Sequence, residues 1–265
     1  MKQSQAKKRD NAMTNKILMG LIALVLGLLF LEILIVHSKN EQQKNASNQV
    51  QTARIMANGD LLYHDGLYMS ALQSDGSYDF TENFTYVKPW LQQADLVLGD
   101  FEGTINPDYP LSGYPLFNAP QSVTAAIKDA GYDVMDLAHN HILDSGLEGA
   151  FTTADAFKKV GIDPIGVYEK PVRDKAPLLI KNVNGIKVAI LSYAYGYNGL
   201  ESNLTDKEVA DHLSNLDEKR MKAEIQRAEK EADITVIMPQ MGVEYRLEPT
   251  DEQVKLYHKM IDWGA

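Results

Sequence analysis

The sequence predicts an α/β domain that follows a single membrane-spanning helix. From Thr52 onward, short β-like runs alternate with amphipathic helical stretches, which is the pattern of layered α/β folds. Ahead of them, residues 17–36 form an unbroken apolar run. A chain of 265 residues suits one large domain or two small ones. No composition break divides 52–265, so we expect one domain there.

The apolar run at 17–36 is long enough to cross a bilayer, because 20 helical residues span roughly 30 Å. Its one charge, Glu32, lies near the far end, where the cost is lowest. Residues 1–16 form a tail with five basic residues and one acid. The positive-inside rule then places the N-terminus in the cytoplasm and the main domain outside it, on a single-pass anchor in the cell membrane.

A cleaved signal peptide is the alternative, but that would need a shorter apolar region and small residues at a cleavage site. Residues 37–51 are polar and read as a flexible linker.

Charge and composition exclude several classes of protein. The net charge of −10 argues against a nucleic-acid partner, which would need a basic face. The chain has no cysteine, so a disulfide scaffold, a thiolate zinc site and a cysteine nucleophile are excluded. Any metal must be held by oxygen and nitrogen ligands.

The expected strands and helices alternate along the domain. Strands are expected at 53–60, 94–103, 132–141, 162–167, 177–183, 186–195 and 232–245. Helices are expected at 85–93, 121–131, 147–160, 205–231 and 249–263. Pro120 suits a helix start, Gly131 and Gly161 suit helix ends, and Asn184-Gly185 is a hairpin signal. The pattern stops after a helix, with no final strand, so we expect the domain to be truncated at its C-terminal side.

Polar residues lie at the carboxyl ends of four of the expected strands. They are Asp60, then Asp100 and Glu102, then His139, Asn140 and His141, and finally Gln240 and Glu244. In α/β sheets, ligands bind outside the carboxyl ends of the strands. Carboxylates, Asn and His together suit Mn²⁺, Mg²⁺, Fe²⁺ or Zn²⁺. A metal bound here would activate water for displacement at phosphorus.

Each of these signals also has a structural interpretation. A Gly-Asp pair after a strand is common turn chemistry. His139 is interpreted first as a buried core or supporting histidine. Asp144 and Ser145 either cap the following helix or, in the case of Asp144, orient a nearby histidine.

Residues 117–153 resemble the CapA family of poly-γ-glutamate capsule synthesis proteins, a branch of the calcineurin-like metallophosphoesterases. The shared motifs are NGD (58–60), GDFE (99–102), AHNHILDSG (138–146) and PQMGVEY (239–245), and the resemblance covers 53–265. It implies a two-sheet α/β sandwich flanked by helices. It also implies an exterior location beside a membrane-bound polyglutamate synthase.

The resemblance also assigns roles by position. Asp60, Asp100, Glu102 and Asn140 would be metal ligands, and His141 would be the phosphate-contacting or general-acid histidine. Supporting positions would be His139, Asp144, Gln240 and Glu244.

Three positions depart from the family pattern, with Asp100 and His139 each replacing Asn and Gln240 replacing His. The terminal G-H-x-H element is absent. An amide is a weaker ligand than imidazole for borderline metals, so the site is expected to hold one metal or none.

Two functions follow. The first is a membrane-anchored accessory protein in the synthesis or export of poly-γ-glutamate or another envelope polymer. The alternative is a metal-dependent phosphoesterase acting on an envelope phosphate ester. A structural domain with a vestigial site is a third interpretation.

Overall fold

The computed structural model describes residues 27–39, 50–172 and 175–265. Residues 52–265 form one compact unit, and the preceding residues form another. In the first unit, residues 27–39 are helical, with exposed apolar side chains. The predicted span begins at residue 17, and residues 17–26 lie outside the described residues, as does the basic tail. Within the described ranges, no helix is long and apolar enough to cross a membrane. The anchor therefore stays a prediction.

The domain at 52–265 contains two β-sheets. The first is all parallel, in the order β1 (Ile55–Asp60), β2 (Leu96–Asp100), β3 (Val134–Asp136), β4 (Asp163–Ile165). The second is mixed, in the order β5 (Leu179–Val183), β6 (Ile186–Ala194), β7 (Ile234–Gln240). β5 and β6 form the predicted hairpin, in which Asn184 and Gly185 both have positive φ, as a type I′ turn requires.

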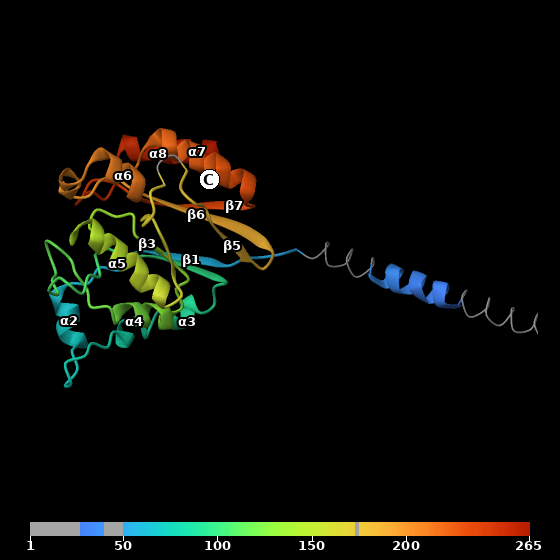
Figure 1. Ribbon diagram of the computed structural model, residues 1–265, viewed down its shortest axis with the longest axis horizontal. Coiled ribbons are helices and arrows are strands. Elements are labelled where there is room, and N and C mark those ends of the chain that lie inside the picture. Colours follow the sequence, from blue (N-terminus) through green and yellow to red (C-terminus); the bar gives the residue numbers. More distant parts are fainter. Residues whose placement is uncertain (1–26, 40–49, 173–174) are drawn as a thin grey trace, which may run out of the picture. The chain divides into compact units, whose positions relative to one another are not determined.

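Helices cover the outer face of each sheet (Figure 1). The helices beside the first sheet are α2 (Asp65–Ala71), α3 (Lys88–Leu91), α4 (Val123–Ala130) and α5 (Gly146–Lys159). Those of the C-terminal half are α6 (Asp206–His212), α7 (Glu218–Glu231) and α8 (Asp251–Trp263). Two 3₁₀ turns, η1 (Thr81–Phe84) and η2 (Leu200–Asn203), complete the fold.

Alternating side chains of the strands build the layers. Leu96 and Leu98 of β2 pack with Val188 and Ile190 of β6 between the two sheets. The intervening Val97 faces the helices of the first sheet instead. Because successive strand residues point to opposite faces, each sheet buries both faces. The result is the helix–sheet–sheet–helix sandwich that the family resemblance implies.

Several predicted elements are shorter than expected. The helix at 121–131 begins only at Val123, after a turn in which Val123 N–H bonds to the Pro120 carbonyl. At 85–93, only Lys88–Leu91 is α-helical, because Pro89 fits only in a first helical turn. The strand predicted at 132–141 ends at Asp136, since the Asp136 carboxylate accepts a hydrogen bond from Ala138 N–H and turns the chain.

The long helix predicted at 205–231 is wrong. It is two helices, α6 and α7, separated by an extended segment. In that segment Leu213 is fully buried and pairs with Val167, while Asn215 pairs with Ala194. Asp217 then caps α7 by accepting a hydrogen bond from Arg220 N–H. Tertiary pairing therefore overrides the charged helical pattern of this region.

Candidate functional site

The parallel register of the first sheet brings its acidic residues together. Asp60 of β1 is aligned with Asp100 of β2, and Asp100 is aligned with Asp136 of β3. Glu102 follows β2 after one residue. One carboxylate oxygen from each of Asp60, Asp100 and Glu102 lies within 4.8 Å of the other two. We call these three residues the acidic triad, and the sequence predicts all three.

Burial makes the acidic triad costly without a counter-ion. Asp100 and Glu102 are buried, whereas Asp60 is exposed. Burial, together with neighbouring Asp60, raises the pKa of Glu102 to about 8. Burial and the adjacent Asp136 raise the pKa of Asp100 well above its usual range. Within the described residues, Asp100 Oδ1 and Glu102 Oε2 are buried and have no hydrogen-bond partner.

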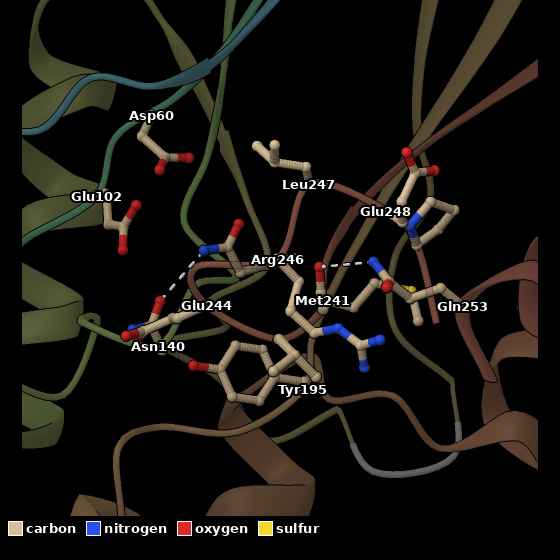
Figure 2. A pocket seen from close by; sticks show the side chains of 14 residues that line it. Asp60, Glu102, Asn140, Tyr195, Met241, Glu244, Arg246, Leu247, Glu248 and Gln253 are labelled. Carbon is tan, nitrogen blue, oxygen red and sulfur yellow. Dashed lines mark hydrogen bonds between the residues drawn. The ribbon is translucent and has the colours of Figure 1, made fainter. Parts of the chain in front are cut away.

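These orphaned oxygens fit a divalent cation. A buried carboxylate without a partner is strongly disfavoured, and a bound metal removes that penalty by accepting the free lone pairs. Asn140, 5% exposed on the loop after β3, lines the same cleft as Asp60 and Glu102 (Figure 2). The residues present are therefore compatible with a divalent metal.

His141 lies beside the acidic triad and is held by Asp144. Its Nδ1 is 2.8 Å from Asp144 Oδ2, and its Nε2 is 4.0 Å from Glu102 Oε1. Asp144 Oδ2 also accepts a 2.6 Å hydrogen bond from Phe117 N–H. The Phe117 ring packs edge-on against the imidazole, with centroids 4.8 Å apart. A carboxylate on Nδ1 keeps the proton there and leaves Nε2 as the basic nitrogen.

The capping interpretation of Asp144 and Ser145 does not describe their contacts. Ser145 occupies the N-cap position of α5 but makes no side-chain cap. Its hydroxyl donates instead to Thr104 Oγ1. Asp144 orients His141, which is the second interpretation of that residue.

His139 lies below the site in the core. It is fully buried, and its Nδ1 accepts a hydrogen bond from His141 N–H. Burial, with the neighbouring His141, lowers its pKa to about 3. His139 is therefore neutral and shapes the loop that carries Asn140 and His141, in line with its structural interpretation.

The second sheet supplies the opposite wall of the site. Gln240, the last residue of β7, donates from Nε2 to Asn140 Oδ1 at 3.2 Å. Glu244 lines the cleft, and its charge helps to raise the pKa of Glu102. The cleft has a volume of about 590 Å³. Figure 2 shows Glu102 and Asp60 on one side of it, with Arg246 and Gln253 toward the other.

Sequence reasoning missed three residues at the site. Asp136 is fully buried beside Asp100, and burial raises its pKa to about 8. Its signal was its place in the strand register, which requires the paired strands to be known. Asn198 bonds Asn140, and Arg246 is a basic residue of a cleft whose other charged lining residues are acidic. The Asn198-Gly199 pair after an expected strand could have indicated a left-handed backbone conformation at Asn198.

Comparison with known proteins assigns the family. The model of the bacterial capsule synthesis protein family PGA_cap matches residues 54–265. A capsule biosynthesis protein CapA from Bacillus anthracis is 30% identical over 191 residues, which are 69% of this chain and 46% of the relative. A PGA biosynthesis protein CapA from Bacillus subtilis is 26% identical over 261 residues, which are 97% of this chain and 66% of the relative. The chain thus spans between about half and two thirds of the length of these relatives.

Among solved structures, a putative 5′-nucleotidase from Staphylococcus aureus, in complex with α-ketoglutarate, has the same fold. It is superposed with a TM-score of 0.50 at 15% identity, covering 79% of this chain and 42% of the nucleotidase. The calcineurin-like phosphoesterase YfkN from Bacillus subtilis gives a TM-score of 0.44 at 15% identity, covering 76% of this chain and 65% of YfkN. At this identity the likeness to the nucleotidase describes the fold alone. The match across residues 54–265 shows that the chain belongs to the bacterial capsule synthesis protein family PGA_cap, to which the CapA resemblance pointed.

Proposed function

We propose that this chain acts in the synthesis or export of a capsule or envelope polymer, with poly-γ-glutamate as the first candidate. The observation that carries the proposal is the family match over 54–265, with relatives named for capsule and PGA biosynthesis. The apolar run at 17–36 behind a basic tail supports a membrane anchor with the domain outside the cytoplasm. A membrane-bound polyglutamate synthase is the partner that this placement suits.

The charge of the cleft favours action with a partner over direct capture of the polymer. Asp60, Glu102, Glu244 and Glu248 line it, and Arg246 is the basic residue among its lining side chains. An anionic polymer would be repelled from such a surface unless a cation neutralised it. The role is therefore that of an accessory to the synthase, and direct polymer contact requires a bound metal.

We further propose that the site hydrolyses a phosphate ester with the help of a bound metal. The observation that favours this second function is the acidic triad with the His141–Asp144 pair beside it. Asp60, Asp100, Glu102 and Asn140 would hold the ion, and their oxygens favour Mg²⁺ or Mn²⁺ over softer metals. A metal held there activates water and stabilises negative charge at phosphorus.

The chain's own residues then manage the proton of the leaving group. Asp144 holds the Nδ1 proton of His141 and fixes the orientation of the imidazole ring. His141 takes up a proton at Nε2 and donates it to the leaving oxygen. The Phe117 amide fixes Asp144, and the Phe117 ring covers one edge of the imidazole.

Deletion of the gene in the bacterium that carries it tests both functions. The wild-type gene should restore cell-bound polyglutamate, measured as glutamate released by acid hydrolysis. Equal restoration by Asp60→Asn and His141→Ala would support an accessory role and overturn the hydrolase. Restoration by the wild type alone would support the hydrolase. Unchanged polymer in the deletion strain would overturn the capsule function itself. Protease treatment of intact cells tests the location, because an exterior domain should be digested.

A further inference from the structure

We propose that Asn198 is a positioning residue that fixes the orientation of the Asn140 amide, so that its oxygen faces the metal. This inference rests on the metal site of the proposed function. Asn198 lies on the loop after β6 of the second sheet, 58 positions from Asn140. Asn140 Nδ2 donates to Asn198 Oδ1 at 3.2 Å. Asn198 Nδ2 lies 3.4 Å from His141 Nε2 and 3.5 Å from His141 Nδ1.

The orientation problem arises because an amide has one end that binds a cation and one that repels it. The Asn140 side chain has nearly the same shape after a 180° rotation, which exchanges its oxygen with its NH₂ group. Only the oxygen can be a metal ligand. Some neighbouring group must therefore decide which end faces the acidic triad.

The donors and acceptors of Asp144, His141 and Asn198 determine, one after another, which end of the Asn140 amide faces the acidic triad. The Asp144 carboxylate can only accept, so it keeps the proton on His141 Nδ1 and leaves Nε2 as an acceptor. In the neutral imidazole, Nε2 is then the ring nitrogen that can accept from the Asn198 NH₂ group, 3.4 Å away, and this turns the Asn198 oxygen toward Asn140. The Asn198 side-chain oxygen in that position can accept a hydrogen bond only from the NH₂ group of Asn140. The Asn140 oxygen is thereby directed away from Asn198, toward Gln240 Nε2 and the cleft.

The backbone at Asn198 supports a side-chain role. Its φ is 54°, in the left-handed region, and the next residue, Gly199, has a φ of 81°. Glycine adopts the left-handed conformation more readily than any other residue, and Asn tolerates it better than most. The turn would therefore accept glycine in place of Asn198 without backbone strain. What glycine would remove are the two contacts to Asn140 and His141.

Asn198→Gly tests the role directly, because glycine keeps the backbone conformation and removes both contacts. We expect Mn²⁺ affinity of the full chain, purified in detergent and measured by titration calorimetry, to fall by about 10- to 100-fold, as for other groups that orient ligands. Asn184→Gly is the matched control, since Asn184 has a φ of 53° in the β5–β6 turn, away from the site. It should leave the affinity within about twofold. Asn198→Asp keeps an acceptor for Asn140 and should not weaken binding.

A double-mutant cycle separates positioning from a structural effect. In an Asn140→Asp background, both ends of the side chain are oxygens, so no orientation is needed. There Asn198→Gly should change Mn²⁺ affinity by less than about twofold. Wild-type binding with no loss in Asn198→Gly, or an equal loss in both backgrounds, would overturn the role of Asn198 while the metal site stands. An absence of binding by the wild type would overturn the metal site, and this inference with it.

Discussion

His141 Nδ1 lies 2.8 Å from Asp144 Oδ2. The same carboxylate oxygen accepts a hydrogen bond of 2.6 Å from the backbone N–H of Phe117. His141 and Asp144 are three positions apart in the loop that leads from β3 into α5. One oxygen therefore ties the imidazole to the backbone of a different loop. This contact fixes the protonated nitrogen of His141 and, through Asn198, the orientation of the Asn140 amide.

Removal of the Asp144 carboxylate should disable proton transfer by His141. In Asp144→Ala the imidazole loses the group that holds its Nδ1 proton, so hydrolysis of a chromogenic phosphodiester should fall by about 10²- to 10⁴-fold. The matched control is Asp155→Ala on the exposed side of α5, which should keep full activity. Unchanged turnover in Asp144→Ala would show that His141 has no acid role.

The stability of the metal-free protein should fall as pH rises from about 5 to 8. Burial raises the pKa values of Glu102 and Asp136 to about 8, so the folded protein keeps protons that the unfolded chain releases near pH 4 to 5. Because the folded state binds more protons across that window, the stabilisation is present at its lower end and lost as pH passes 8.

Thermal unfolding in EDTA measures this dependence. The Tm should be several degrees higher at pH 5.5 than at pH 8.5, and Glu102→Gln should flatten the slope. Excess Mn²⁺ should oppose the trend, since metal binding requires ionised carboxylates. A Tm that rises with pH in EDTA would mean that ionisation of Glu102 and Asp136 does not destabilise the folded protein.

The buried ion pair between Arg220 and Glu224 of α7 should be the most sensitive polar contact of the C-terminal half. Glu224 is 3% exposed, accepts from Arg220 Nε at 2.9 Å and accepts from the Tyr193 hydroxyl at 2.8 Å. Glu224→Ala leaves the Arg220 charge without its partner and should cost about 3–5 kcal/mol. Glu218→Ala on the same helix breaks only an exposed pair with Lys259 and should cost at most about 1 kcal/mol. Urea unfolding measures both, and equal losses would contradict the burial argument.

Gly166 should tolerate no side chain, because the backbone of the site loop touches it. A Cβ at Gly166 would lie 2.6 Å from Ala138 N, and its φ is 91°. Gly76 has a similar φ of 86° but open space around it. Gly76→Ala should therefore cost about 1 kcal/mol for the backbone alone, and Gly166→Ala about 3 kcal/mol with the added clash. Similar unfolding free energies for the two variants would contradict a close approach at Ala138.

The sequence was sufficient to predict those parts of the fold that depend on local pattern. Short, nearly continuous apolar runs predict β2 and β6, and Asn184-Gly185 predicts the turn between β5 and β6. It was insufficient where tertiary pairing decides, as at Leu213, where a buried extended segment interrupts a helical charge pattern. The end of β3 also could not be predicted, because residue propensities do not show that the Asp136 carboxylate accepts a hydrogen bond from Ala138 N–H.

At the site, the sequence predicted the groups at strand ends and missed those that depend on the register. Asp60 and Asp100 end recognisable strands, Glu102 follows the second of them, and the structure brings the three together. Asp136 reaches Asp100 only because β2 and β3 align in one register. Asn198 comes from the other sheet, and no local pattern shows that it meets Asn140.

The central claim is that the acidic triad holds a divalent metal, and calorimetric titration of the full chain with Mn²⁺ tests it most directly. We expect one ion per chain and an affinity at least tenfold weaker in Asp60→Asn. Asp129→Asn, on the exposed end of α4, should bind as the wild type does. Absence of binding by the wild type at millimolar Mn²⁺, or equal binding by Asp60→Asn, would contradict a metal site at the acidic triad.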